Sequence, residues 1–209
     1  MRDEPLDELD SRLYGLDIET DTAAGGLDPT KAAVVAVAVS TDDGDVVLDG
    51  PEAQLLMHLE QHLSSLPPGV VVTWNGASFD LPFLADRAAR HAVALGLTLA
   101  ADPTIAVRSA LPGHDGAYRA TWGRHGHLDG YRLYRADVGR TLGLSCGLKQ
   151  LAGLVGLEAV TADRARIHEL STEQLHRYVA SDARLARLLV TRRMPHALAA
   201  IDRRAVTAA

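Results

Sequence analysis

Hydrophobic residues in the first quarter of the chain form short runs that are typical of β-strands. Such runs cover residues 12–19, 32–40 and 45–48, and a Thr-Asp-Asp-Gly turn at residues 41–44 joins the last two. Three consecutive strands with short connections predict an antiparallel meander.

A helical pattern follows these strands. Between residues 51 and 66, leucines recur at the spacing of one helix face: Leu55, Leu56, Leu59 and Leu63. A Pro-Pro-Gly sequence ends this helix, and the apolar run 70–74 predicts a buried strand. A strand, a helix and a returning strand imply that the last strand pairs parallel to its neighbour in a mixed sheet.

The rest of the chain is predicted as an alternation of helices with less regular segments. We expect a helix over 81–95, a strand or short helix over 128–138, a short helix over 147–155, a loop over 161–167, and a long helix over 171–193. Ser171 with Gln174 three positions later is a capping-box signal for the start of the long helix. The pattern predicts one α/β domain over residues 12–209, preceded by a loose acidic arm at 1–11.

Composition supports a globular protein and excludes several classes. The 209 residues are 47% hydrophobic and 23% charged, with no stretch of eighteen consecutive apolar residues and an acidic, non-apolar start. We therefore expect neither a membrane span nor a secretion signal. The single Cys146 excludes an internal disulfide and a cysteine-based zinc site, which favours a reducing, cytoplasmic setting.

The charge is unevenly distributed along the chain. The total of -6 divides into a net -10 over residues 1–50 and +4 over residues 51–209. Residues 108–140 contain six arginines, with histidines and aromatic residues between them. Such a segment is typical of a surface that binds a phosphate backbone, and scattered surface arginine is an equally good reading of it.

Two acidic residues on the first strand are candidates for chemistry. Asp17 and Glu19 point to one face, whereas Tyr14, Leu16 and Ile18 point to the other. Two carboxylates side by side on a core strand are costly to bury. Either they take part in function, or Glu19 marks the exposed end of the strand and Asp17 has a local partner.

Asp182 lies in the middle of the apolar face of the last helix, among Leu175, Tyr178, Leu185 and Leu189. A buried carboxylate needs a cation, and no Lys or Arg lies one turn away on this face. A metal ion is a candidate for that partner. Tyr178 would place its hydroxyl beside the carboxylate, although filling the core is the commoner role of such a tyrosine.

A fourth acid, Asp80, follows the strand at 70–74. On its own it is most simply a helix cap, as Asn75 is a turn residue and Phe79 a core anchor. If Asp80 meets Asp17, Glu19 and Asp182, the four carboxylates carry -4, which two Mg²⁺ or Mn²⁺ ions would neutralise. That arrangement is typical of two-metal hydrolysis of a phosphodiester.

Three segments contain these acids in order: residues 14–21 (YGLDIETD), 74–83 (WNGASFDLPF) and 178–183 (YVASDA). They resemble the three motifs of the DEDD superfamily of 3′-5′ exonucleases, and most closely those of the proofreading domain of family B DNA polymerases. The superfamily has either His five residues or Tyr four residues before the final Asp. Arg177 occupies the first position and Tyr178 the second, so the chain resembles the Tyr branch.

This resemblance implies a ribonuclease H-like fold, with a five-stranded mixed sheet flanked by helices. It also implies a metal-dependent exonuclease that hydrolyses terminal phosphodiesters of single-stranded nucleic acid, DNA favoured, to nucleoside 5′-monophosphates. Two divalent ions, Mg²⁺ or Mn²⁺, would be held by the four acids Asp17, Glu19, Asp80 and Asp182. Tyr178 would help to orient the attacking water, and the candidates for gripping the terminal nucleotide are Thr20, Asn75 and Phe79.

Several alternatives remain open at this point. The same site would suit a 3′-5′ exoribonuclease, and a non-catalytic nucleic-acid-binding relative would keep the fold. A third alternative is an α/β domain in which the motifs occur by chance. The chain works alone or with a polymerase or repair partner, and we expect the arginines of 108–140 to rim the cleft that holds Asp17.

Overall fold

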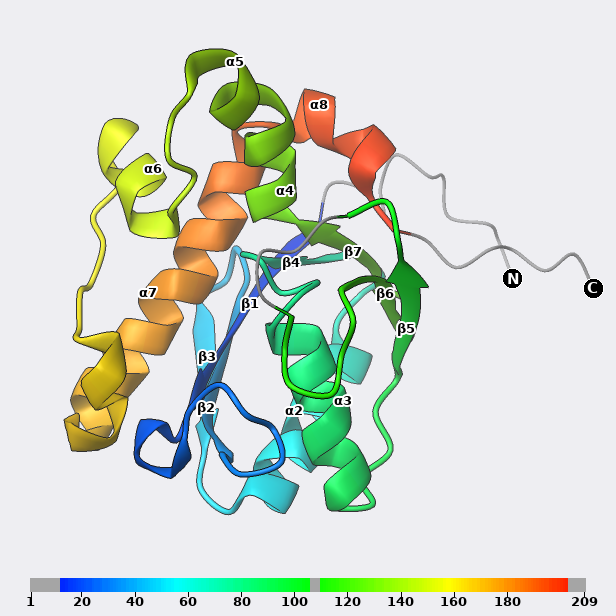
Figure 1. The fold of residues 1–209 in the computed structure, drawn as a ribbon, viewed down its shortest axis with the longest axis vertical. Helices are drawn as coiled ribbons and strands as arrows, with labels where there is room; N and C mark the ends of the chain where they lie inside the picture. Colours follow the sequence, from blue (N-terminus) through cyan, green and yellow to red (C-terminus); the bar gives the residue numbers. More distant parts are fainter. Residues whose placement is uncertain (1–11, 106–109, 203–209) are drawn as a thin grey trace, which may run out of the picture.

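The computed structural model describes residues 12–105 and 110–202. Figure 1 shows a central sheet with helices on both faces. The acidic arm predicted at residues 1–11 lies outside the described residues. Within the described ranges, no helix is long and apolar enough to cross a membrane.

The sheet has five strands in the order β3-β2-β1-β4-β7. The strands are β1 (Leu13–Thr20), β2 (Val34–Ser40), β3 (Asp45–Asp49), β4 (Val70–Thr73) and β7 (Gly126–Asp129). β1, β2 and β3 pair antiparallel, and β4 pairs parallel to both β1 and β7. The predicted meander, the parallel returning strand and the five-stranded mixed sheet are all confirmed.

Helices cover the two faces of the sheet. The longer ones are α2 (Glu52–Ser65), α3 (Asp80–Arg90), α6 (Leu148–Leu154) and α7 (Thr172–Thr191). The shorter segments are η1 (Thr22–Ala24), α4 (Gly130–Tyr134), η2 (Arg135–Gly139), α5 (Arg140–Leu142), η3 (Arg164–Glu169), α8 (Met194–Ala197) and η4 (Leu198–Ala200). α2 and α3 lie on one side of the sheet, and α7, drawn in orange, crosses the other (Figure 1).

The alternation of side chains along β1 separates two cores. Tyr14, Leu16 and Ile18 are buried in the cluster that contains the leucines of α2 and Phe83 of α3. Leu13 belongs to the cluster on the other face, with residues of α6 and α7. Asp17 and Glu19 share the face of Leu13 because side chains two residues apart on a strand point the same way. They therefore face α7.

α7 lies close to β1 and β2 because the facing residues are small. Ala36 and Ala38 of β2 form a buried cluster with Val179, Ala180 and Ala183 of α7. The helix begins with the predicted capping box: Ser171 accepts a hydrogen bond from the backbone of Gln174, whose side chain accepts one from the backbone of Ser171. These features fix both the start of α7 and its distance from the sheet.

α3 is shorter than predicted. It ends at Arg90 instead of residue 95, because Ala92 adopts a left-handed conformation with φ of 53°. The amide of Val93 then bonds back to the carbonyl of Ala88, which is a helix-ending arrangement that usually uses glycine. The sequence offers neither Gly nor Pro at this point, so the helix end carried no local signal.

The middle of the chain differs most from the prediction. A hairpin of β5 (Leu97–Asp102) and β6 (Ala117–Trp122) forms a second, two-stranded sheet that was not predicted. The segment predicted as either strand or helix at 128–138 is both, because β7 runs directly into α4. The loop predicted at 161–167 overlaps η3, a 3₁₀ helix that begins at Arg164.

Candidate active site

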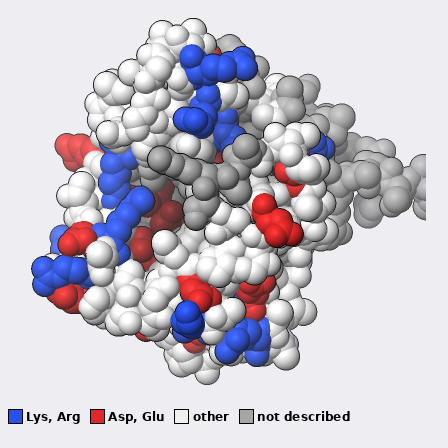
Figure 2. Space-filling model, viewed as in Figure 1, with Lys and Arg blue, Asp and Glu red and all other residues white. Residues whose placement is uncertain are grey.

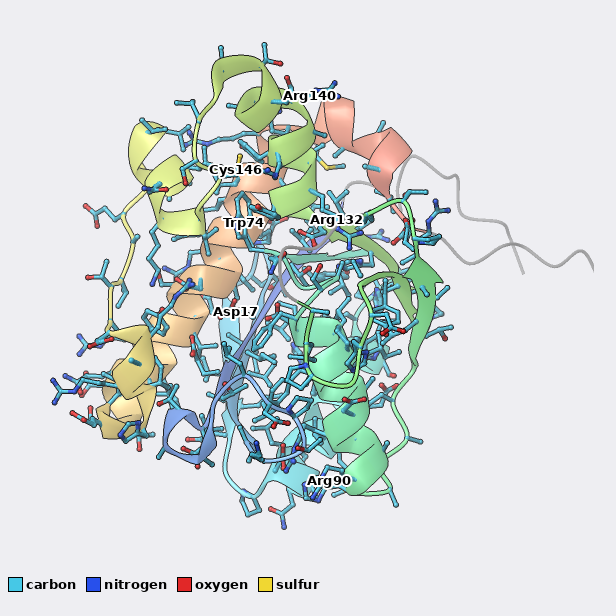
Figure 3. The ribbon with its side chains drawn as sticks, viewed as in Figure 1. Asp17, Trp74, Arg90, Arg132, Arg140 and Cys146 are labelled. Carbon is cyan, nitrogen blue, oxygen red and sulfur yellow. The ribbon has the colours of Figure 1, made fainter. Side chains whose placement is uncertain are left out.

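Three carboxylates meet where α7 crosses β1. Asp17 and Glu19 come from β1 and Asp182 from α7, and one ligand oxygen from each lies within 4.8 Å of the others. Asp182 is buried, whereas Asp17 and Glu19 are partly exposed. In Figure 3, Asp17 lies near the centre of the molecule, between α7 and the start of α3. The structure thus brings together three of the four predicted acids as one tight group.

Asp80 lies near this group, at the start of α3. It is the first residue of α3, and the turn before it requires Asn75 in a left-handed conformation with φ of 68°. Gly76 is needed in the same turn, since a Cβ atom there would lie 2.4 Å from the side chain of Thr73. Asp80 is outside the group of three, but its charge is close enough to raise the pKa of Asp17.

Burial raises the pKa of every carboxyl group in the site. Loss of hydration is the largest cause for all four, and it raises the pKa of Glu19 to about 8 and that of Asp80 to about 7. The pKa of Asp17 is well above its usual range because Asp80, Asp182 and Glu19 add their repulsion to the effect of burial. The pKa of Asp182 is also raised by burial, against the opposing charges of nearby cations.

Those cations are Lys149 of α6 and Arg164 of η3. Lys149 Nζ lies 3.2 Å from Asp182 Oδ1, and the positive charge of Arg164 lowers the pKa of all four carboxyl groups. Asp182 therefore has cationic partners, although no Lys or Arg lies one turn away on its own face of α7. The partners come from two other segments that pack beside this helix.

Tyr178 is buried and held from two directions. Arg164 Nε donates a hydrogen bond of 3.4 Å to its hydroxyl oxygen. Lys149 Nζ lies 3.7 Å from the centroid of its ring, at the distance of a cation–π contact. The side chain is 1% exposed. Tyr178 is therefore both a core residue and part of the polar site.

Acidic atoms lie in a recess on the face shown in Figure 2, with basic side chains beside and above them. The position of this recess corresponds to that of Asp17 in Figure 3. The site thus combines a negative floor with a positive border.

Comparison with known proteins connects this geometry to a family. Residues 37–135 match the sequence model described as "DNA polymerase family B, exonuclease domain". A DNA polymerase of Archaeoglobus fulgidus is 30% identical over 85 residues, which is 40% of this chain and 11% of that protein. The chain resembles the proofreading 3′-5′ exonuclease domain of family B DNA polymerases.

The fold comparison covers most of the chain. A family B DNA polymerase from Pyrobaculum calidifontis superposes with a TM-score of 0.67 at 23% identity, over 88% of this chain and 24% of that one. The chain thus spans a small part of each polymerase that it matches. The predicted family resemblance and the ribonuclease H-like fold are confirmed.

The part of this chain that matches the family model, residues 37–135, contains Asp80. It contains neither Asp17 and Glu19 of β1 nor Asp182. The fold comparison covers the longer range, and the 4.8 Å group shows that the acids outside the matched segment converge. The geometry therefore adds to what the sequence match alone provides.

The carboxylate group has the chemistry of a divalent-metal site. Oδ1 of Asp182 is buried and accepts no hydrogen bond within the described part of the chain, although Lys149 Nζ is at ion-pair distance. Hard cations such as Mg²⁺ and Mn²⁺ prefer carboxylate oxygens. Three closely spaced carboxylates fit such an ion.

Asp129 is a positioning residue that the sequence reasoning did not single out. It ends β7, and its carboxylate accepts hydrogen bonds from the backbone amides of Asn75 (2.9 Å), Ala77 (3.3 Å) and Tyr131 (3.0 Å). It therefore ties the turn before Asp80 to the start of α4. An acid directly after a strand, followed by glycine, was the only local signal, and the same pattern occurs in ordinary turns.

The three residues predicted to grip a nucleotide have different environments. The hydroxyl of buried Thr20 donates to the carbonyl of Gly26 at 2.5 Å, so it holds the loop after β1. Asn75 is exposed. Phe79 is half-buried and packs against Phe83, with ring centroids 5.5 Å apart.

The arginines of residues 108–140 do not form the predicted rim as a group. Arg124 donates a hydrogen bond to the carbonyl of Leu66, which precedes β4 in the chain. Asp80 comes after the last residue of β4, so Arg124 lies toward the other end of that strand. Arg119 is paired with Asp102 across the β5–β6 hairpin. Arg132 lies 3.5 Å from Asp129 and is drawn near Trp74 in Figure 3, while Arg140 lies away from Asp17 in that view. Arg108 is outside the described residues.

Proposed function

We propose that this chain is a metal-dependent 3′-5′ exonuclease that hydrolyses the terminal phosphodiester of single-stranded nucleic acid, DNA favoured, to nucleoside 5′-monophosphates. The observation that carries the proposal is the convergence of Asp17, Glu19 and Asp182 within 4.8 Å, in a chain that resembles an exonuclease domain. Asp80 completes the set of four acids.

The four carboxylates would hold two divalent ions, Mg²⁺ or Mn²⁺. Such ions, when bound, polarise the phosphodiester and lower the pKa of an attacking water. Lys149 and Arg164 already contribute two positive charges, so the four acids and two bases together carry -2. Two divalent ions would then leave +2, which suits a phosphodiester and an attacking hydroxide.

The residues around the acids would orient the reacting groups. The Tyr178 hydroxyl accepts from Arg164, so its own hydrogen is free to be donated to a water above the carboxylates. Exposed Asn75 and half-buried Phe79 lie on the turn before Asp80, where they would contact the last nucleotide, with Phe79 stacking on its base or sugar. Thr20 would act by shaping the loop beside Glu19.

The proposal is tested with a single-stranded oligonucleotide labelled at its 5′ end, incubated with Mg²⁺ or Mn²⁺. We expect a ladder that shortens from the 3′ end and is lost in Asp17→Ala and Asp182→Ala. Asp43→Ala is the matched control because Asp43 is exposed on the β2–β3 turn. The absence of a ladder, or a ladder that both site variants still produce, would overturn the proposal.

The choice between DNA and RNA is tested in the same assay. Paired DNA and RNA strands of one sequence, in competition, report the preference directly. Faster loss of the RNA would identify the chain as an exoribonuclease with the same site. Binding of both strands without cleavage, and no heat of Mn²⁺ binding, would identify a non-catalytic relative.

The proposal also includes the cellular environment of the protein and a protein partner. The free Cys146 is buried and suits a reducing, cytoplasmic environment. The likeness to one domain of family B polymerases suggests work with a polymerase or repair partner in trans. Stimulation of the exonuclease by an added polymerase would test that association.

A further inference from the structure

Arg164 enters the candidate site from a segment that contains none of the three exonuclease motifs. It is the first residue of η3, in the connection between α6 and α7. Its Nε donates to the hydroxyl oxygen of Tyr178, and this hydrogen bond is the main reason that the pKa of Arg164 is raised. Among the basic groups of the described residues, it is the one whose charge acts on all four carboxylates.

The backbone around Arg164 is fixed at both ends of η3. Asp163 caps the segment by accepting from the amide of Ala165 at 3.0 Å. His168 is joined to the hydroxyl of Thr22 of η1 by two hydrogen bonds, one between that hydroxyl and ring Nδ1 at 2.7 Å and one donated by the His168 backbone amide at 3.3 Å. Because η1 directly follows β1, this link holds Arg164 at a set position relative to Glu19.

The next arginine on the segment provides an internal comparison. Arg166 pairs with Glu169, and its side chain is 63% exposed. It makes no contact with Tyr178 or the acids among the interactions of the described residues. Two arginines two positions apart thus have different surroundings, and only Arg164 reaches the site.

We infer that Arg164 is a positioning residue for the proposed hydrolysis, which holds the Tyr178 hydroxyl toward the carboxylates and keeps a permanent positive charge beside them. A hydroxyl that accepts from a guanidinium has its own hydrogen left for another acceptor. Arginine stays charged at any working pH, so this arrangement does not depend on protonation. The inference rests on the proposed function.

This role predicts two effects of opposite sign when Arg164 is removed. Turnover falls because the Tyr178 hydroxyl loses its partner and is no longer aimed, by about 10- to 100-fold. Binding of a divalent ion becomes tighter, by about 3- to 10-fold, because a positive charge near the carboxylates has been removed. A residue that only stabilised the fold would weaken both turnover and metal binding.

The experiment compares Arg164→Ala, Arg164→Lys and the control Arg166→Ala. Steady-state degradation of a 5′-labelled oligonucleotide gives kcat and KM, calorimetry with Mn²⁺ gives metal affinity, and thermal unfolding shows that each variant is folded. We expect Arg164→Lys to bind Mn²⁺ as the unaltered protein does and to regain part of the rate. Arg166→Ala should match the unaltered protein in both measurements.

A double-mutant cycle tests whether Arg164 acts through Tyr178. In a Tyr178→Phe background, Arg164→Ala should slow turnover less than it does in the unaltered protein. An unchanged rate in Arg164→Ala, an equal effect in both backgrounds, or Mn²⁺ binding that is unchanged or weaker would each overturn the inference. If the unaltered protein degrades no nucleic acid, the proposed function fails, and the Mn²⁺ titration still decides the effect of Arg164.

Discussion

Gly15 of β1 lies directly beneath the carbonyl group of Ala183 on α7, so close that a Cβ atom on Gly15 would be 2.0 Å from that oxygen. Ala183 follows Asp182 in α7, and Asp17 lies two residues after Gly15 in β1. The contact between these two backbones therefore sets how closely the carboxylates of the two elements approach. A residue without any charge determines the geometry of a highly charged site.

Gly15→Ala should damage metal binding as well as stability. The added methyl group must push α7 away from β1, which costs about 1–3 kcal/mol of unfolding free energy and separates Asp17 from Asp182. Denaturant unfolding and calorimetry with Mn²⁺ measure the two effects. Gly153→Ala on α6 is the matched control, because a Cβ atom there meets nothing within 4 Å. Unaltered Mn²⁺ affinity in Gly15→Ala would contradict the explanation.

Asp80→Asn should change how the stability of the metal-free protein depends on pH. Asp80 is buried, and its pKa is raised to about 7, whereas the unfolded chain releases this proton near 3.8. The folded protein thus holds more protons between about pH 4 and pH 7, so its stability falls as pH rises through that window. The Asp80→Asn variant has no titrating group at this position, so it does not lose this stability as pH rises.

The comparison is made with chelator-treated protein at pH 4.5 and pH 7.5. The unfolding free energy of Asp80→Asn relative to the unaltered protein should rise by about 1–3 kcal/mol between the two values. Histidines far from the site titrate in both proteins and cancel in the difference, whereas Asp17, whose pKa is no longer raised by Asp80, adds to the rise. A constant difference across this range would show that Asp80 is ionised throughout.

Asp129→Ala should loosen the turn that carries Asn75 and leads into Asp80. Three backbone amides lose their acceptor, which costs about 2–4 kcal/mol of unfolding free energy. The exonuclease should show a higher KM, because the turn is proposed to contact the nucleotide. Asp129→Asn keeps one carbonyl acceptor, so its unfolding free energy and its KM should lie between those of Asp129→Ala and the unaltered protein. Asp115→Ala, at an exposed position, is the control and should leave both quantities unaltered.

Tyr178→Phe should give a slower exonuclease that binds metal normally. The ring stays in the core and keeps its face toward Lys149, so unfolding free energy should change by about 1 kcal/mol or less. The rate should fall by about 10- to 100-fold because the water loses an orienting donor. Equal rates for the two proteins would remove the hydroxyl from the reaction, and loss of Mn²⁺ binding would assign it a structural role.

Local patterns in the sequence were sufficient for much of the fold. The alternation along β1 placed Asp17 and Glu19 on one face, the leucines of α2 defined its buried side, and the capping box marked the start of α7. Each of these signals lies within a few residues of the element that it describes. The order of strands and helices then restricted how the sheet could be arranged.

The features that were missed depend on residues far apart in the sequence. A long connection separates the two strands of the β5–β6 hairpin, and these strands pair with each other instead of joining the main sheet. Lys149 and Arg164 reach Asp182 from two separate segments, so no pattern on α7 reveals them. Asp129 acts through backbone amides on another loop, and backbone partners leave no trace in side-chain patterns.

The crossing of α7 over β1 also has a consequence for how the protein is made. Asp17 is synthesised early and Asp182 late, and their carboxylates share one group. A chain still emerging from the ribosome can pair β1, β2 and β3 before α7 exists, yet it holds only part of the cluster. Loop-closure entropy makes such a distant contact a late event in folding. If the chain has the proposed nuclease activity, it would stay inactive during its own translation, because the site is complete only when α7 has been made.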